Sequence, residues 1–167
     1  WLVPPLAVLA GGLLVRVFII FHDCGHGSFY ASRRANDVWG FLAGLLTFTP
    51  YYAWRWEHSI HHASAGNLDR RGIGDVWTMT IDEYLASSRW RRFLYAVARH
   101  PAVFLGLAPL VLFVFVQRIP PAKAGPRERR SVWWMNLALV AMGAGMSAIF
   151  GLVPYLVIQG SVIAVAG

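Results

Sequence analysis

The chain has 167 residues, of which 57% are hydrophobic and only 14% are charged, a balance typical of membrane proteins rather than soluble domains. The net charge of +7 does not indicate a nucleic-acid partner, because the basic residues stand between apolar segments, as in positive-inside topology and binding to anionic headgroups. The single cysteine, Cys24, excludes an internal disulfide framework and a cysteine-based metal site. We expect it to be a packed core thiol.

Residues 1–21 form the first expected transmembrane span. They are apolar apart from Arg16, and about 20 such residues cross a bilayer. The chain begins on Trp1 and stops inside the apolar run 159–167. We therefore expect residues 1–167 to be a single domain that is truncated at both ends.

Five of the six histidines fall in two short clusters. On helices, residues spaced i, i+3 and i+4 share a face, so each cluster would present its imidazoles together. Neutral imidazole is a common ligand of Zn, Cu, Fe and Ni, and five imidazoles exceed what one four-coordinate ion needs. We predict a site for more than one metal ion, with the ligands His22, His26, His58, His61 and His62. The sixth histidine, His100, has no companion and is expected to be an ordinary interfacial side chain.

The apolar segment 38–54, which follows a polar turn at 32–37, separates the two clusters. As a helix it would reach only about 24 Å, short of the ~30 Å hydrocarbon core, and Pro50 would break it near its end. A full crossing would also leave the clusters on opposite faces of the membrane. We therefore expect 38–54 to be re-entrant or interfacial.

A polar loop, 63–79, leads to Thr80–Glu83, a sequence that predicts a capping box at the start of a helix. The helix that follows carries four arginines and an apolar side, and we expect it to lie in the headgroup plane. Three of these arginines, Arg89, Arg91 and Arg92, together with Arg55, are alternatively a surface that steers an acidic electron donor. We favour the interpretation that these arginines bind phospholipid headgroups. The four are Arg89, Arg91, Arg92 and Arg99.

Residues 102–116 are apolar but short, and they contain Pro109. A full crossing here would place the basic loop 118–130 outside, against the positive-inside rule, so this segment too is expected to be re-entrant or interfacial. Ser131 is predicted to cap the next helix, 132–151 to span, Leu152–Pro154 to turn and 153–167 to begin a returning span. Together these elements predict an all-α membrane protein with its histidine-cluster helices at the cytosolic face.

The H-x3-H and H-x2-HH pattern, set among membrane segments, resembles the membrane fatty-acid desaturase family. The amino-acid sequences of these motifs are most similar to those of bacterial acyl-lipid desaturases of the delta-12 (omega-6) type. The two clusters look like that family's first and second histidine boxes, and the resemblance extends over most of the chain. The residues that carry it are His22–Phe29, Trp54–His62, Gly66–Asp69, Asp82–Tyr84 and Arg127–Trp134.

The resemblance implies two non-haem iron ions held by the five clustered histidines and by a third H-x2-HH box, which would lie beyond Gly167. It implies an O2-dependent oxidoreductase that introduces a cis double bond into a fatty-acyl lipid, with electrons from ferredoxin or a cytochrome b5-type protein. It also implies a bacterial inner membrane with the histidine boxes facing the cytoplasm. Without the third box, the chain alone is expected to be inactive.

Four further polar residues are candidates for orienting the ligands. Metal-bound imidazoles commonly donate their second N–H to a carboxylate, so Asp23 and Glu57 are either such acceptors or hydrated interface charges. Asn67 and Asp69 either orient the second cluster or build a turn, and we favour the turn.

Other functions fit parts of the pattern. A related di-iron hydroxylase, acetylenase or carotenoid ketolase could use nearly the same boxes. From another class, a metal transporter would place its ligands nearer the bilayer midplane. A haem held by one facing pair of histidines would leave three of them unexplained.

Overall fold

The structure, a computed structural model, describes residues 2–166, and within this range every regular element is helical. The all-α fold class is thereby confirmed. The α-helices are α1 Val3–His26, α2 Arg33–Leu46, α3 Tyr51–Ser64, α4 Ile81–Ala86, α5 Arg89–Arg99, α6 Ala108–Val114, α7 Pro126–Phe150 and α8 Leu152–Ala166. Shorter pieces are the 3₁₀ turns η1 Leu68–Arg70 and η3 Val116–Arg118 and the π-helical η2 Ala102–Leu107.

Two helices, α1 and α7, are long and apolar enough to cross a membrane, with 24 and 25 residues. The first turn of α1 contains proline, whose fixed φ suits that position, and the helix ends at Gly27 with φ +71°. The Gly27 amide closes this end by donating to the carbonyls of Asp23 and Cys24. The first histidine cluster therefore occupies the last, well-capped turns of a membrane-length helix. The third apolar helix, α8, is shorter.

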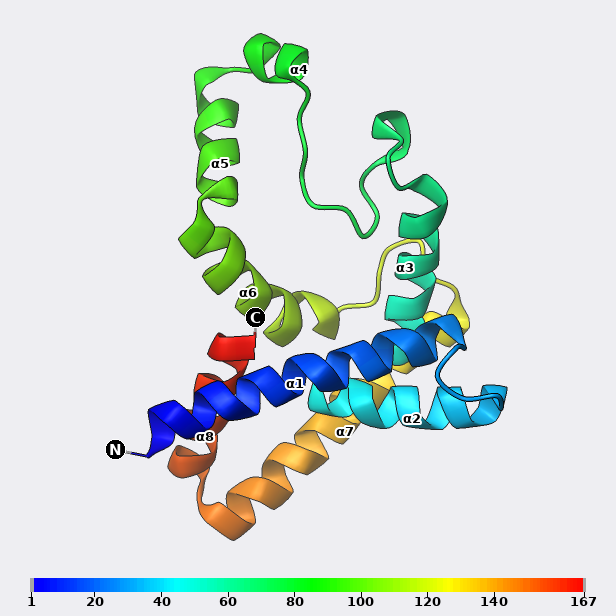
Figure 1. The fold of residues 1–167 in the computed structure, drawn as a ribbon, viewed down its shortest axis with the longest axis vertical. Helices are drawn as coiled ribbons and strands as arrows, with labels where there is room; N and C mark the ends of the chain where they lie inside the picture. Colours follow the sequence, from blue (N-terminus) through cyan, green and yellow to red (C-terminus); the bar gives the residue numbers. More distant parts are fainter. Residues whose placement is uncertain (1, 167) are drawn as a thin grey trace.

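The chain reverses after α1, so that α2 packs along it (Figure 1). Ser32 caps α2 by accepting the Ala35 amide at 3.3 Å. Residues 33–37 are consequently helical, and the polar turn expected at 32–37 is wrong beyond Ser32. A serine followed by good helix formers is itself a helix-start signal.

A second reversal, at residues 47–50, turns α2 into α3. Phe48 has a φ of +58°, the left-handed region that side chains other than glycine seldom adopt. Gly40 lets the two helices meet closely, since a Cβ there would lie 2.2 Å from Cε2 of Tyr51. Residues 38–54 thus form two helices with a break between them, and this reversal brings both histidine clusters to one place. That the segment is re-entrant or interfacial in a membrane stays a prediction.

A small aromatic core lies where α1, α2 and α3 meet. Phe21, Cys24 and Tyr51 are fully buried there, which agrees with the expectation of a packed core thiol. The Tyr51 hydroxyl donates to the Cys24 carbonyl at 2.7 Å, and this bond ties the start of α3 to the last turns of α1.

The segment α4–α6 forms an arm that leads away from α3 and returns beside α8 (Figure 1). Thr80 and Glu83 make the predicted capping box. The single helix expected after it is broken, because Ser88 caps a new helix, α5. The limbs Arg89–Arg99 and Ala102–Arg118 are bent by 62°, the geometry of a broken span or a re-entrant loop.

The last two helices begin at other residues than the sequence predicted. Helix α7 starts at Pro126 after the cap residue Gly125, so Ser131 lies inside the helix and does not cap it. Helix α8 starts at Leu152, directly after Gly151 with φ +87°, so the turn expected at Leu152–Pro154 is wrong. Proline is well tolerated in a first helical turn, which explains why Pro154 belongs to the helix.

Candidate metal centre

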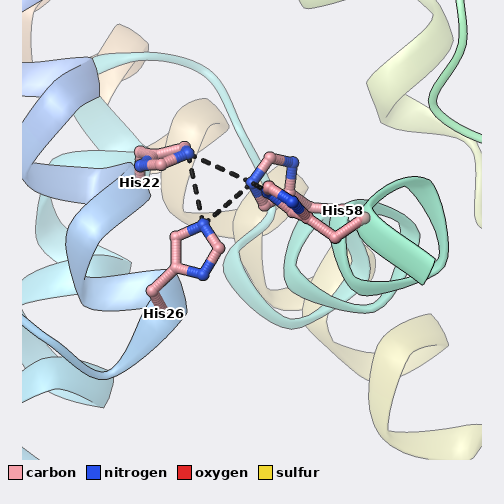
Figure 2. Close-up of side chains that lie close together, drawn as sticks. His22, His26 and His58 are labelled. Atoms are coloured by element: carbon pink, nitrogen blue, oxygen red, sulfur yellow. Dashed lines mark hydrogen bonds between the residues drawn. The ribbon is translucent and has the colours of Figure 1, made fainter. Parts of the chain in front are cut away.

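Four imidazoles converge between the end of α1 and the second half of α3. Figure 2 shows three of them, His22, His26 and His58. The Nε2 atom of His58 lies 3.1 Å from that of His22, 3.1 Å from that of His26 and 3.0 Å from that of His62. The Nε2 atoms of His22 and His26 are 3.3 Å apart. All four nitrogens lie within 4.8 Å of one another. We call these residues the four-histidine cluster.

The four contacts of 3.0–3.3 Å match the spacing of ligands around one transition-metal ion. Metal–nitrogen bonds of ~2.0–2.1 Å in a tetrahedral shell place the nitrogens about 3.3 Å apart. Each neutral imidazole has only one N–H, so four Nε2 atoms that face one another cannot all be satisfied by hydrogen bonds. A cation accepts all four lone pairs at once, and the donor set therefore fits a metal such as iron.

Burial favours the neutral form of one member of this cluster, His58. Burial, followed by the repulsion of the other box histidines, lowers the pKa of His58 to about 4. An unprotonated imidazole is the form that binds metal, so His58 can bind a metal at neutral pH without first losing a proton.

Aromatic packing holds His58 in place. Trp54, one turn earlier on α3, stacks on its imidazole, and the same indole contacts Phe21 and Phe18 of α1. The site therefore rests on the core that joins the two helices.

His61 stands apart from the four-histidine cluster. Its ring lies beside those of His58 and His62, at centroid distances of 6.1 and 5.8 Å. Its Nδ1 atom lies 2.6 Å from Oδ1 of Asp75, in the loop after η1. The structure thus brings four of the five predicted ligands together. The fifth, His61, lies next to them and contacts the carboxylate of Asp75.

The predicted orienting residues differ in their contacts. Asp23 lies 3.1 Å from Nδ1 of His22, the contact that an orienting carboxylate makes. Within the described residues, no hydrogen bond joins Glu57 to a box histidine, and burial raises the pKa of its carboxyl group. The Asn67 side chain accepts the amide of Asp69 at 3.0 Å, so Asn67 builds the turn we favoured.

Sequence reasoning missed Asp75. It is fourteen residues from His61 along the chain, too far for any helical spacing rule. A visible signal was its position after Gly72-Ile73-Gly74, since paired glycines mark a turn that can bring a loop against a helix. The amide of Gly72 and then His61, through hydrogen bonds, lower the pKa of the Asp75 carboxyl group.

Bilayer-length helices and a cluster of imidazoles suited to a transition metal define a helical membrane protein with a histidine metal site. The sequence model of the family described as "Fatty acid desaturase" matches residues 1–166. The chain belongs to the fatty acid desaturase family.

Individual relatives agree with this assignment. A fatty acid desaturase of Bacillus subtilis is 43% identical over 162 residues, which cover 97% of this chain and 46% of the relative. An sn-1 acyl-lipid omega-3 desaturase (ferredoxin) of Synechocystis is 40% identical over 61% of this chain and 29% of its own length. An sn-1 oleoyl-lipid 12-desaturase of the same organism is 30% identical over 59% and 28%. The chain thus spans less than half the length of these relatives, and no solved structure matches it.

Proposed function

We propose that this chain is part of a membrane acyl-lipid desaturase that introduces a cis double bond into a fatty-acyl chain. The reaction takes two hydrogen atoms from adjacent methylenes and, with O2, two electrons and two protons, yields the alkene and two waters. The observation that carries the proposal is the four-histidine cluster, because it brings four imidazole nitrogens together as possible ligands of one metal ion. The family match adds the reaction class.

The proposed cofactor is a pair of non-haem iron ions, which would supply the redox chemistry with O2. The four-histidine cluster has the spacing of a site for one ion, and His61 would belong to the second. The ligand set is therefore His22, His26, His58, His61 and His62, with Asp23 orienting His22 through the contact to its Nδ1 atom. Asp23 holds the orientation of the His22 imidazole, and the stacked indole of Trp54 holds that of His58.

An apolar pocket of about 780 Å³ supports an acyl substrate. It is lined by Phe18, one turn before His22 on α1, and by Val76 and Trp77, which follow Asp75 in the chain. Helix α6 and its π-helical start form another part of the wall. A hydrocarbon chain in this pocket lies against the elements that carry the histidines, and the apolar walls exclude water from it.

The proposed substrate is an acyl lipid. The proposed reaction is 12-desaturation, which the sequences of the histidine boxes favour. One relative is named a 12-desaturase and another an omega-3 desaturase, so omega-3 desaturation is the competing reaction. For the electron donor we propose a ferredoxin, as in the name of the omega-3 relative, with a cytochrome b5-type protein as the alternative. The proposed location is a bacterial inner membrane, with the histidine boxes on the cytoplasmic side where such donors are reduced.

The test is to express the full-length parent in a host that lacks polyunsaturated lipids and to follow acyl chains by mass spectrometry. We expect a new diunsaturated chain and two irons per protein. The His58→Ala variant should lose the product and retain membrane insertion, while His100→Ala, outside the boxes, should behave as wild type. An inserted, iron-loaded wild type that yields no unsaturated product overturns the proposal, and a hydroxylated acyl chain identifies the related hydroxylase.

A further inference from the structure

The hydrogen bond between His61 and Asp75 joins two parts of the chain that no regular element connects. The Nδ1 atom of His61 and Oδ1 of Asp75 are 2.6 Å apart, a short distance even for a charge-assisted bond. The Asp75 side chain is only 18% exposed and that of His61 36%. The pair is therefore a partly desolvated contact, in which a hydrogen bond to an ionised group is stronger than at an open surface.

The loop is shaped to deliver this carboxylate. The second oxygen of Asp75, Oδ2, accepts the Gly72 amide at 3.0 Å, which fixes the plane of the carboxyl group. Gly74, with φ +75°, lies directly against α3, and a Cβ there would be 3.0 Å from Cβ of His61. Glycine thus permits both the backbone conformation and the close approach.

The bond selects one form of the imidazole. When Nδ1–H donates to Asp75, the lone pair of His61 is on Nε2, the atom that the other box histidines also use. A carboxylate partner further raises the basicity of the ligand and prevents rotation of the ring. Asp75 therefore does for His61 what Asp23 does for His22.

We propose that Asp75 is a positioning residue that holds His61 as a metal ligand distinct from the four-histidine cluster. The inference rests on the proposed function only in that the site binds a metal; it does not depend on which acyl product forms. The competing explanation is that Asp75 merely closes the turn at Gly72. The two differ in what the neutral isostere does, because an asparagine still accepts the Gly72 amide but offers His61 no charge.

The experiment is a titration of chelator-treated full-length parent with Fe(II), in which bound metal is measured directly. Comparison of His61→Ala with His58→Ala separates the metal that depends on His61 from the metal held by the four-histidine cluster. We expect Asp75→Asn and Asp75→Ala to weaken the His61-dependent component about 10- to 100-fold and to leave the other component unchanged. Asp82→Asn is the matched control, since it removes the charge of an exposed aspartate in α4.

Two outcomes overturn the proposal: wild-type Fe(II) binding in Asp75→Asn, whether or not Asp75→Ala loses metal, or the absence of a His61-dependent component. Gly74→Ala provides an independent variant that keeps the carboxylate and displaces it; it should weaken the same component. A wild type that binds iron without desaturating a lipid refutes the proposed reaction and leaves the role of Asp75 measurable. Wild type that binds no iron refutes both.

Discussion

The indole of Trp54 lies almost parallel to the imidazole of His58, with ring centroids 4.3 Å apart and planes inclined by 17°. On the neighbouring helix, the buried residue Gly25 approaches the same indole so closely that a Cβ would lie 2.7 Å from Cζ3 of Trp54. Trp54 is thus held between a metal-box histidine of its own helix and the backbone of α1. The position of α1 sets the position of His58 through this one ring.

We predict that Gly25→Ala displaces Trp54 and lowers metal binding at the four-histidine cluster. The added methyl overpacks a closed contact, which typically costs about 1–3 kcal/mol. Gly12→Ala is the control, because a Cβ at Gly12 meets no atom within 4 Å and alanine favours a helix by roughly 0.5–1 kcal/mol. Metal content and thermal unfolding of the full-length protein provide the readouts. Equal metal content in the two variants would contradict the role given to Trp54.

Tyr51→Phe should destabilise the protein by about 1 kcal/mol, the usual net value of one hydrogen bond. The variant removes the bond to the Cys24 carbonyl from a side chain with no exposed surface and leaves the ring packing intact. Thermal unfolding in detergent measures the change. Tyr155→Phe serves as the comparison, since the described residues offer its hydroxyl no hydrogen bond, and an equally large effect there would argue against the assignment.

Ser131→Ala should loosen the junction between α3 and α7. The Ser131 hydroxyl accepts the amide of Tyr52 at 3.0 Å, and Tyr52 is in the first turn of α3, where amides have no partner within the helix. Loss of the acceptor leaves a partly buried N–H unpaired, at a cost of about 1–3 kcal/mol. Hydrogen exchange at the start of α3 should accelerate, whereas Ser147→Ala, farther along α7, should leave it unchanged.

The two ends of α7 should be accessible from opposite sides of the membrane. With 25 residues, the helix is roughly 37 Å long, enough for the ~30 Å hydrocarbon core. Because Cys24, the only cysteine among these 167 residues, is buried, single cysteines introduced as Lys123→Cys and Leu152→Cys can be distinguished from it by labelling. We expect an impermeant reagent to reach Lys123→Cys from the cytoplasmic face alone and Leu152→Cys from the outer face alone. Labelling of both from one side would show that α7 does not span.

Local signals predicted much of this fold. The helix of α1, its histidine cluster and the capping box of Thr80 with Glu83 each depend on residues within one or two turns. The errors arose where two local signals competed. Ser131 can cap a helix, but Gly125 followed by proline is an earlier and equally valid start.

The site was only partly readable for a different reason. Helical spacing put His22 beside His26 and His58 beside His62, and the reversal at 47–50 then joined the pairs. Spacing gives His61 the same face as His58, yet its ring turns to Asp75 in a distant loop. A contact between a helix and an irregular loop depends on backbone angles such as that of Gly74, which no periodic pattern encodes.

The order Asp75-Val76-Trp77 places the carboxylate that contacts His61 directly before two side chains that line the apolar pocket. A substitution at Trp77 that reshapes the pocket for another acyl length also pulls on the backbone that carries Asp75. If the proposed function holds, chain-length preference and metal occupancy should therefore vary together. Engineering for a new substrate at these positions should be accompanied by an iron assay, because a lost product can report a vacated metal site instead of a rejected lipid.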